Sequence, residues 1–466
     1  MFFGLKIGDL KTDRKQGGTQ ALNDKNQTGD PSQAASTDTS ASAANPDQVL
    51  SATGAEISSK SLPWYFGGQG IWYAAMGLQM VLFPFLSAFV LGLDARYIGM
   101  AQLAIMGPGL ILLLPAGVIA DHLDERSYLI KLHFIAAIPP LFLASILFAD
   151  KLSFGLLVGY AIFAGTLTTL AVPARDSLLN HLVPHSSLNR FIAFATALQF
   201  GGQLVGMALA AFAKYTGAAP FFLVHSAMMI LGGLSLSRIR MAQHDVSHEP
   251  LGRDLRRYAR SIGEAVSFLF TSKVLSPIMI CNSAIGFFFV GSFMVAVPMF
   301  VRDVFEGAAQ QIATLHISFF LGTVISALTI MRLGHIKHRG RLMVIGLSAG
   351  TSICYLMTRD VPFVLFAGIM FTWGIGAGIV MTMSRTIIQE AAPDDMRARL
   401  LAAFQMGVMG FGPIGSLVTG YVIDLYGPQK AMLLPCIGMG LTLLIVLSTT
   451  GIWSITDKAT ARSEGA

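Results

Sequence analysis

The chain has 466 residues, of which 53% are hydrophobic and only 12% are charged, and its mean hydropathy is +0.63. Soluble proteins carry roughly 25% charged residues, so these values exclude a soluble protein and indicate a membrane protein. The net charge of +6 does not point to nucleic acid, because the basic residues lie in the breaks between apolar runs. Each of the three cysteines lies alone in an apolar run, so we expect no disulfide, no metal site and no cofactor.

The first 62 residues differ in kind from the rest of the chain. They are polar, rich in Ser, Thr, Asn, Gln and Gly, and hold few apolar side chains that a core could bury. This composition predicts a disordered tail over residues 1–62. Its start, MFFGLKIGDLKTDRK, has charges where a signal peptide has an unbroken apolar core, so we expect the first apolar helix to direct membrane insertion.

Apolar runs separated by short polar breaks follow from Pro63 onward. Most are roughly 18 to 25 residues long, the length of helix that crosses about 30 Å of hydrocarbon. The sequence therefore predicts an all-α membrane protein with twelve transmembrane helices, over residues 64–92, 96–120, 127–149, 152–174, 188–213, 218–238, 274–302, 311–333, 341–358, 361–389, 397–424 and 428–452.

The longest break divides these twelve spans six and six. We therefore expect an N-terminal six-helix bundle over 63–238, a linker over 239–273, a C-terminal six-helix bundle over 274–455 and a short tail over 456–466. Lys and Arg are divided unevenly between the two sides of these spans. With the N-terminus inside, 26 of the 32 lie on the side of the tail and linker and 6 on the other. An excess of Lys and Arg marks the cytoplasmic side, which predicts that both termini are cytoplasmic.

The linker contains a segment with helical periodicity. Leu255, Ile262 and Leu269 fall on one side of a helix, and Arg256 and Arg260 lie beside them. This pattern predicts a basic amphipathic helix on an anionic membrane leaflet, and a solvated basic loop is the alternative.

The two halves of the chain repeat one another. After the fourth span come Arg175, a proline and Arg190, and after the tenth come Arg385, a proline and Arg399. The offsets are 210 for the first arginine pair and 209 for the second. An even number of spans separates the copies, so the repeats have the same orientation and are related by an axis along the membrane normal.

Two segments carry a resemblance to a known family. Residues 117–126 read GVIADHLDER after the second span, and residues 173–184 read PARDSLLNHLVP. With the repeat, they resemble the major facilitator superfamily over residues 63–455, in particular the branch of the enterobactin exporter and the macrolide efflux proteins, the transmembrane secretion effectors. The chain departs from the family pattern at His122, and the matching segment of the second half, 332–341, has no acidic residue.

The resemblance implies two pseudo-symmetric six-helix bundles that rock about a central site. It implies a secondary active transporter rather than an enzyme, placed in the bacterial inner membrane, acting on a small organic molecule and functional as a monomer in the lipid bilayer. Sequence signatures of ATP hydrolysis, zinc peptidases or potassium selectivity filters do not occur in the chain.

A conformational switch is expected on the cytoplasmic side. Asp121 ends the second span, where the negative end of the helix dipole disfavours a carboxylate that has no cationic partner. Arg397 and Arg399 begin the eleventh span and offer such partners, while solvation by loop water is the alternative. A cross-interface pair of this kind would hold the cytoplasmic side shut and release on rocking. The expected switch residues are Gly117, Asp121, Arg126, Arg175, Arg385, Arg397 and Arg399.

Polar and aromatic side chains are expected to line a central cavity near the bilayer midplane. Hydrogen bonding between helices is the alternative role for each of them. Together they describe an aromatic, uncharged cavity suited to a bulky amphipathic compound. The predicted substrate-binding residues are Gln69, Tyr73, Gln79, Thr166, Thr169, Gln199, Gln203, Asn282, Phe289, Phe293, Thr372, Trp373 and Gln405.

Protons are the expected coupling ion, although no Asp, Glu, Lys or Arg falls in the middle of any predicted span. His316 is the best titratable candidate because histidine changes charge near neutral pH, with a structural histidine as the alternative. Asp94 and Asp303, near the outer ends of the first and seventh spans, are the other candidates.

Export of a drug-like or siderophore-like amphipathic compound, driven by the proton gradient, is the function that these observations favour. A lipid or lysophospholipid flippase of the same fold is one alternative. A membrane receptor or assembly factor that has kept the fold and lost transport is another.

Overall fold

A computed structural model of the protein describes residues 46–183, 187–240, 251–334, 336–393 and 396–455. Within these ranges the side chains of residues 46–60, 113–114, 121, 189, 251–259 and 397–398 are not described. By its backbone contacts the chain divides into residues 1–51 and 52–466, and the description below concerns the second part.

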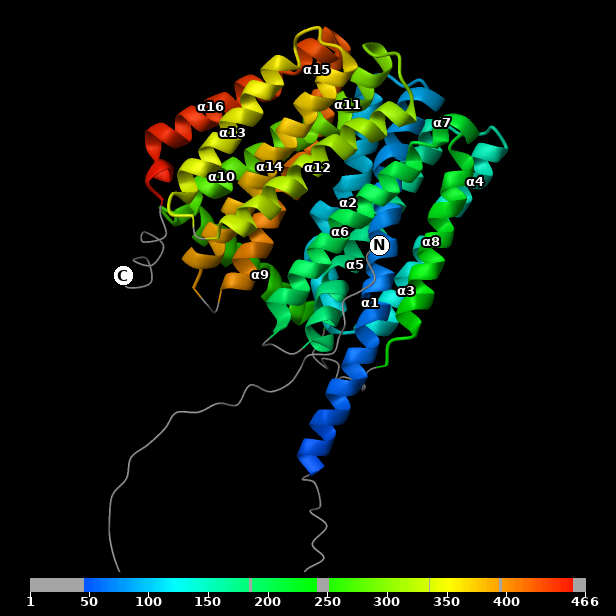
Figure 1. The fold of residues 1–466 in the computed structure, drawn as a ribbon, viewed down its shortest axis with the longest axis vertical. Helices are drawn as coiled ribbons and strands as arrows, with labels where there is room; N and C mark the ends of the chain where they lie inside the picture. The colour runs from blue at the N-terminus through cyan, green and yellow to red at the C-terminus, as the bar shows by residue number, and fades with distance from the viewer. Residues whose placement is uncertain (1–45, 184–186, 241–250, 335, 394–395, 456–466) are drawn as a thin grey trace, which may run out of the picture. The chain divides into compact units, whose positions relative to one another are not determined.

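The described chain is built from helices (Figure 1). The first half comprises α1 (Pro46–Phe85) with its π-helical end η1 (Leu86–Val90), α2 (Ala95–Asp121), α3 (Glu125–Ala136), α4 (Ile138–Phe148), α5 (Phe154–Leu182), α6 (Leu188–Ala210), α7 (Ala213–Thr216) and α8 (Ala219–Ser237). The linker forms α9 (Leu251–Thr271). The second half comprises α10 (Ser276–Ala284), the π-helix η3 (Ile285–Val290), α11 (Gly291–Asp303), α12 (Ala309–Leu333), α13 (Arg339–Leu356), α14 (Phe363–Ala391), α15 (Arg397–Ala431), α16 (Leu433–Thr449) and the short 3₁₀ helix η4 (Ile452–Ser454).

Ten helices in the described part of the chain are long and apolar enough to cross a membrane. The positions of the predicted ninth and twelfth spans are taken by α13, with 18 residues, and α16, with 17. The predicted all-α fold with twelve transmembrane helices in two six-helix bundles is confirmed. The predicted tails over 1–62 and 456–466 lie outside the described residues, except that α1 already begins at Pro46.

The prediction was wrong about where the fourth span ends. It stopped at residue 174, before the first charged residue, whereas α5 continues to Leu182. Charge ends an apolar run but does not interrupt backbone hydrogen bonding, and arginine is a good helix former. Arg175 therefore lies inside a helix and not in a loop.

One buried apolar cluster runs through parts of both bundles, and a second lies within the first bundle. In the first bundle, α3 and α4 lie along α8, and α2 lies along α5 (Figure 1). In the second bundle, α12 packs along α14, α13 packs against α14 and α16, and α15 packs against η3 and α11. The π-helix η3 interrupts the seventh span at its packing contact with α15. Such local π-helical turns often occur at functional sites.

A polar anchor ties two spans together within each bundle. In the first bundle the Glu125 carboxylate, at the start of α3, accepts a hydrogen bond from Ser177 at 2.9 Å and lies 3.5 Å from His181, both on α5. In the second bundle Arg339, at the start of α13, forms an ion pair with Glu390 on α14. The third span is thus fixed to the fourth, and the ninth to the tenth, by equivalent contacts. The carboxylate lies on the third span in the first bundle and on the tenth span in the second.

Successive spans run in opposite directions, so the bundles have two ends. We call the end where η1 finishes and α2 begins the far end, and the end where α2 finishes and α3 begins the linker end. The linker helix α9 follows α8 at the linker end and contacts α2, α10 and α15. Its side chains Ile262, Ala265 and Leu269 are buried, so this apolar stripe packs on helices of both bundles. Arg260, on its other side, is exposed and pairs with Glu264.

The two bundles meet most closely along α2 and α15. Glycines near the far end permit this approach. A Cβ atom at Gly99 of α2 would lie 2.6 Å from the carbonyl oxygen of Ser416, and one at Gly420 of α15 would lie 2.6 Å from that of Ala95. Real Cβ atoms essentially never come this close to backbone oxygen, so a larger residue at either position must push the helices apart.

We expect Gly99→Val to wedge the far end open and to shift the protein toward a conformation with that end apart. Spin labels at Ser153 and Arg359, exposed at the far end of the first and second bundles, would report this as a longer distance. Gly155→Val is the matched control, because nothing lies within 4 Å of a Cβ atom at Gly155. The same distance distribution in both variants would contradict the expected role of Gly99.

Candidate functional site

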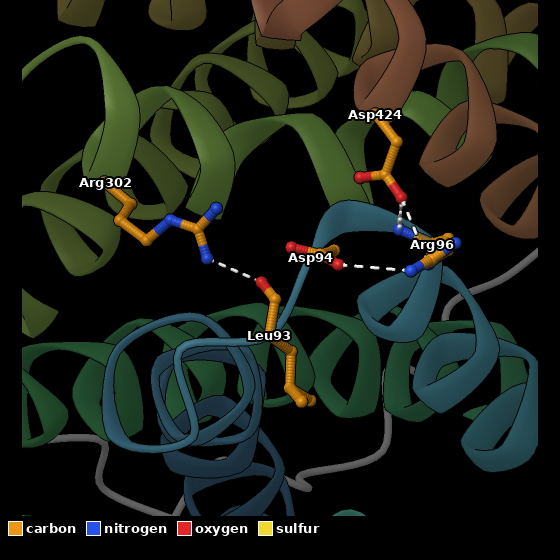
Figure 2. A network of polar contacts seen from close by, with 5 residues as sticks. All are labelled: Leu93, Asp94, Arg96, Arg302 and Asp424. Atoms are coloured by element: carbon orange, nitrogen blue, oxygen red, sulfur yellow. Dashed lines mark hydrogen bonds and ion pairs between the residues drawn. The ribbon is translucent and has the colours of Figure 1, made fainter.

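Charged side chains join the bundles at the far end (Figure 2). Arg302, at the end of α11, donates from Nη1 to the carbonyl oxygens of Leu93 at 2.5 Å and Ala88 at 3.3 Å, both in the first bundle. Its Nε lies 2.6 Å from the carboxylate of Asp303. Hydrogen bonds from a charged donor are stronger than those between neutral groups, so Arg302 is well placed to hold this end together.

A second contact closes the far end beside α2 (Figure 2). The Asp424 carboxylate of α15 accepts a hydrogen bond from the Arg96 backbone N–H at 3.2 Å and lies 3.6 Å from Arg96 Nε. This carboxylate lies at the N-terminus of α2, where the helix dipole favours a negative charge. Asp94 lies 3.4 Å from Arg96 Nη2. The two far-end proton-coupling candidates, Asp94 and Asp303, are thus both paired with a neighbouring arginine, and their role in coupling stays a prediction.

A third hydrogen bond between the bundles lies in the far half of the spans. Gln102 of α2 donates to the carbonyl oxygen of Met294 at 3.5 Å. Near the middle of the spans α6 contacts α12, where the Phe200 and Phe320 rings lie 6.3 Å apart. The far end itself is closed by polar and glycine contacts together.

The predicted switch at the linker end is only partly visible. The side chains of Asp121 and Arg397 lie outside the described residues, and Arg399 is partly exposed. Gly117 is buried. Arg126 donates from Nη2 to the carbonyl oxygen of Ser237 at 2.7 Å, which ties α3 to the end of α8 within one bundle. The role of these residues in switching stays a prediction.

The predicted cavity residues of the first bundle differ in their surroundings. Gln69, Gln79 and Thr169 are buried, and the Thr169 hydroxyl donates to the Gly165 carbonyl oxygen of its own helix at 2.9 Å. Three of the remaining residues, Thr166, Gln199 and Gln203, are partly exposed. The Gln69 amide has neither its oxygen nor its nitrogen hydrogen-bonded to a described residue.

The predicted aromatic residues of the second bundle pack on one another. Phe293 lies 4.9 Å from His316 and 5.8 Å from Trp373, and Trp373 lies 5.7 Å from Phe289. All four are buried, and His316 Nδ1 lies 2.9 Å from the Ile312 carbonyl oxygen. These contacts join η3, α11, α12 and α14.

The other predicted residues of the second bundle are separate from this cluster. Asn282 is buried and donates to the Phe404 carbonyl oxygen at 2.6 Å, which joins α10 to α15. Thr372 and Gln405 are exposed, and the Thr372 hydroxyl donates to Gly368 of its own helix at 2.9 Å. Binding of substrate by any of these residues stays a prediction.

Arg175 carries a charge that is buried within the first bundle. Its side chain is only 6% exposed, and its guanidinium lies 5.0 Å from the Trp72 ring and 4.9 Å from the Tyr73 ring of α1. Nη1 donates to the Tyr73 hydroxyl at 2.9 Å, and the Tyr65 hydroxyl donates to the Arg175 carbonyl oxygen at 3.1 Å. Sequence reasoning missed this site because it placed Arg175 in a loop.

Asp176 is a further residue that sequence reasoning missed. It is exposed on α5, and both Arg175 and Arg385 act on its carboxylate electrostatically. Arg385 is exposed on α14, which occupies the place in the second bundle that α5 occupies in the first. The sequence repeat had paired Arg175 with Arg385. Asp176 could have been noticed because it is the residue that directly follows Arg175.

Twelve spans in two repeated bundles that meet through a closed end are the architecture of secondary transporters. A family model described as Major Facilitator Superfamily matches residues 66–416. The chain belongs to the major facilitator superfamily. No curated protein matches it in sequence.

Solved structures of other transporters share the fold. The nucleoside transporter NupG is 14% identical with a TM-score of 0.61, and the match covers 84% of this chain and 98% of that one. The inward open conformation of the xylose transporter XylE from E. coli is 14% identical with a TM-score of 0.62, covering 88% and 99%. A D-xylose-proton symporter is 15% identical with a TM-score of 0.63, covering 85% and 98%. At these identities the likeness shows the fold alone.

We expect Arg302→Gln to loosen the far end, because it removes the guanidinium that reaches Leu93 and Ala88. Hydrogen bonds to charged groups contribute about 1.5 to 3 kcal/mol, so the closed-to-open ratio should fall about tenfold or more. In a background without native cysteines, Gln102→Cys should react faster with a membrane-impermeant maleimide. Arg359→Gln is the control, because Arg359 is exposed at the same end and contacts Tyr355 of α13, within its own bundle. Equal labelling rates in both variants would show that Arg302 does not hold this end closed.

Proposed function

We propose that the protein is a secondary active transporter that exports an amphipathic organic compound by alternating access, driven by the proton gradient. Membership of the superfamily supports transport. The observation that carries alternating access is the set of cross-bundle contacts of Arg302, Asp424 and the glycines that closes the far end. A transporter of two rocking bundles closes one end while the other admits substrate, and this arrangement has the far end closed.

We place the linker end in the cytoplasm of a bacterial inner membrane, in agreement with the excess of Lys and Arg on that side. The conformation is then inward-facing. In the opposite conformation, Asp121 with Arg397 and Arg399 would close the linker end, while the far-end contacts of Arg302 and Asp424 would be released. Export as the direction rests on the resemblance of residues 117–126 and 173–184 to efflux proteins.

Protons could enter the cycle through the far-end carboxylates. Asp94 and Asp303 lie beside arginines that also join the bundles, so protonation of either carboxylate would change the charge of the far-end network. His316 is the alternative, because it is a titratable group buried in the aromatic cluster of the second bundle. We propose the far-end carboxylates as the first residues to test for coupling.

The test is retention of substrate in a bacterial strain that lacks its main efflux pumps. Cells that express the protein are loaded with macrolides, dyes or catecholate siderophores, with and without a protonophore. We expect lower retention of at least one compound, abolished by the protonophore. Retention of every compound unchanged by expression, with the protein inserted in the membrane, would count against export of drugs and siderophores and favour a lipid substrate or a function without transport.

We expect Asp121→Asn and Asp424→Asn to slow export, because each removes a charge proposed to close one end. A coupling of 1 to 3 kcal/mol corresponds to a change of about 5- to 150-fold, which sets the expected range. Asp150→Asn removes a carboxylate at the start of an exposed far-end loop and serves as the control. Normal export by both gate variants would remove these carboxylates from the mechanism and leave transport itself intact.

A further inference from the structure

The charge of Arg175 is incompletely satisfied. The side chain is 94% buried, and two of its three guanidinium nitrogens, Nε and Nη2, have no hydrogen-bond partner among the described residues. It forms no ion pair with any of those residues. A guanidinium buried without an acceptor is strongly unfavourable, and the face of an aromatic ring compensates only in part. The site therefore lacks an acceptor group.

The Tyr73 hydroxyl transmits the effect of the Arg175 charge to a partly exposed position on α1. Arginine can only donate hydrogen bonds, so the Tyr73 oxygen must accept the bond from Arg175 Nη1. The phenol proton is then free to be donated elsewhere, and the guanidinium behind it strengthens it as a donor. Tyr73 is partly exposed, whereas Arg175 is buried. The pair thus offers a donor backed by a positive charge.

The surrounding charges also favour an anion. Arg385 is near enough to act electrostatically on the Asp176 carboxylate, as Arg175 does. Neither arginine forms an ion pair with any residue that the structure describes. Arg175 comes from the first bundle and Arg385 from the equivalent helix of the second. An acidic group placed between them would complete the charge balance across the interface.

We propose that Tyr73, Arg175 and Arg385 form the binding site for the acidic group of an organic anion, a carboxylate or a phosphate monoester. The inference rests on the proposed transport function and names the class of its substrate: an amphipathic compound that carries one acidic group. The Asp176 carboxylate, next to Arg175 in the chain, repels an anion and attracts a cation, so its removal should tighten the binding of an acid and weaken the binding of an amine.

The position of the site gives substrate binding a mechanical effect. An anion held by Arg175 in the first bundle and by Arg385 in the second attracts both bundles toward itself. A ligand shifts a conformational equilibrium by the difference in its affinity for the two states. The acid binds more tightly when the bundles approach at the linker end, so its binding favours closure of that end.

The test compares probes that share a ring system and differ in charge. Protein in phosphatidylcholine nanodiscs is titrated with 1-naphthoate, 1-naphthyl phosphate, methyl 1-naphthoate and 1-naphthylmethylamine, and binding is followed by the rise in thermal unfolding midpoint. We expect the two acids to bind and the ester and the amine to bind at least about tenfold more weakly, as loss of a charged hydrogen bond predicts. Equal binding of acid and ester, or no response to either acid, would overturn the proposal.

Variants assign the binding to these residues. Arg175→Gln and Arg385→Gln should weaken acid binding about tenfold or more, and Tyr73→Phe should weaken it less. Asp176→Asn, at an exposed position, should tighten it. Arg341→Gln is the matched control, because Arg341 is also an exposed linker-end arginine over an aromatic ring, 5.6 Å from that of Trp453. If Arg175→Gln does not fold, Asp176→Asn carries the test, and weaker acid binding by Asp176→Asn would overturn the proposal.

Two further arms separate the alternatives. Nanodiscs that contain phosphatidylglycerol show whether an anionic lipid headgroup occupies the site: competition with 1-naphthyl phosphate identifies the lipid as the source of the acidic group, and its absence identifies a free organic acid. Acid binding with the expected variant pattern in a protein that exports nothing would support the site and reject the transport function. Export of neutral compounds without any preference for acids would support the transport function and reject the acid-binding site.

Discussion

The interior of a bilayer holds no water that could satisfy a buried polar group, so each such group must find its partner within the protein. This constraint explains much of the structure. Spans are helical because a helix satisfies its own backbone. Buried hydroxyl and amide side chains bond to carbonyl oxygens, as Thr169 and Asn282 do. The carboxylate of Glu125 has acquired partners on α5. Arg175 keeps two buried nitrogens without a hydrogen-bond partner among the described residues, whereas Arg126 and Arg339 keep one each.

The two ends of the bundles are held by different kinds of contact. The far end combines backbone packing at glycines with a few charged groups, of which Asp424 and Arg302 reach backbone atoms of the other bundle. Side chains near the linker end, such as Arg126, Glu125 and Arg339, bond within their own bundle. Contacts within a bundle preserve its shape, while contacts between bundles decide which end is closed. This division lets each bundle move as a unit.

Hydropathy and charge were enough to predict the twelve spans, since both follow from local sequence. The end of the fourth span could not be predicted in the same way, because an apolar run stops at the first charge and a helix does not. Sequence also paired Arg175 with Arg385, but it could not show that the Arg175 side chain packs on Trp72 and Tyr73 of α1. Arg96 and Asp424 are 328 residues apart in the sequence, so no local pattern predicts the contact between them.

The predicted cavity residues illustrate a further limit. Helical spacing correctly brings Phe289 and Phe293 to the same side of the seventh span, where both contact Trp373. Spacing does not reveal whether that side faces a neighbouring helix or an open space. Only the packing of α12 and α14 around these rings decides it, and that packing depends on residues far away in the chain.

The linker helix α9 has a consequence for how the membrane acts on the protein. Its buried stripe of Ile262, Ala265 and Leu269 rests on α2 from one bundle and on α10 and α15 from the other. When the bundles move at the linker end, this stripe must slide or separate from one of them and meet acyl chains in its place. The energy of that exchange depends on lateral pressure and lipid packing in the adjacent leaflet. Bilayer composition thereby becomes one of the quantities that set the balance between the two conformations.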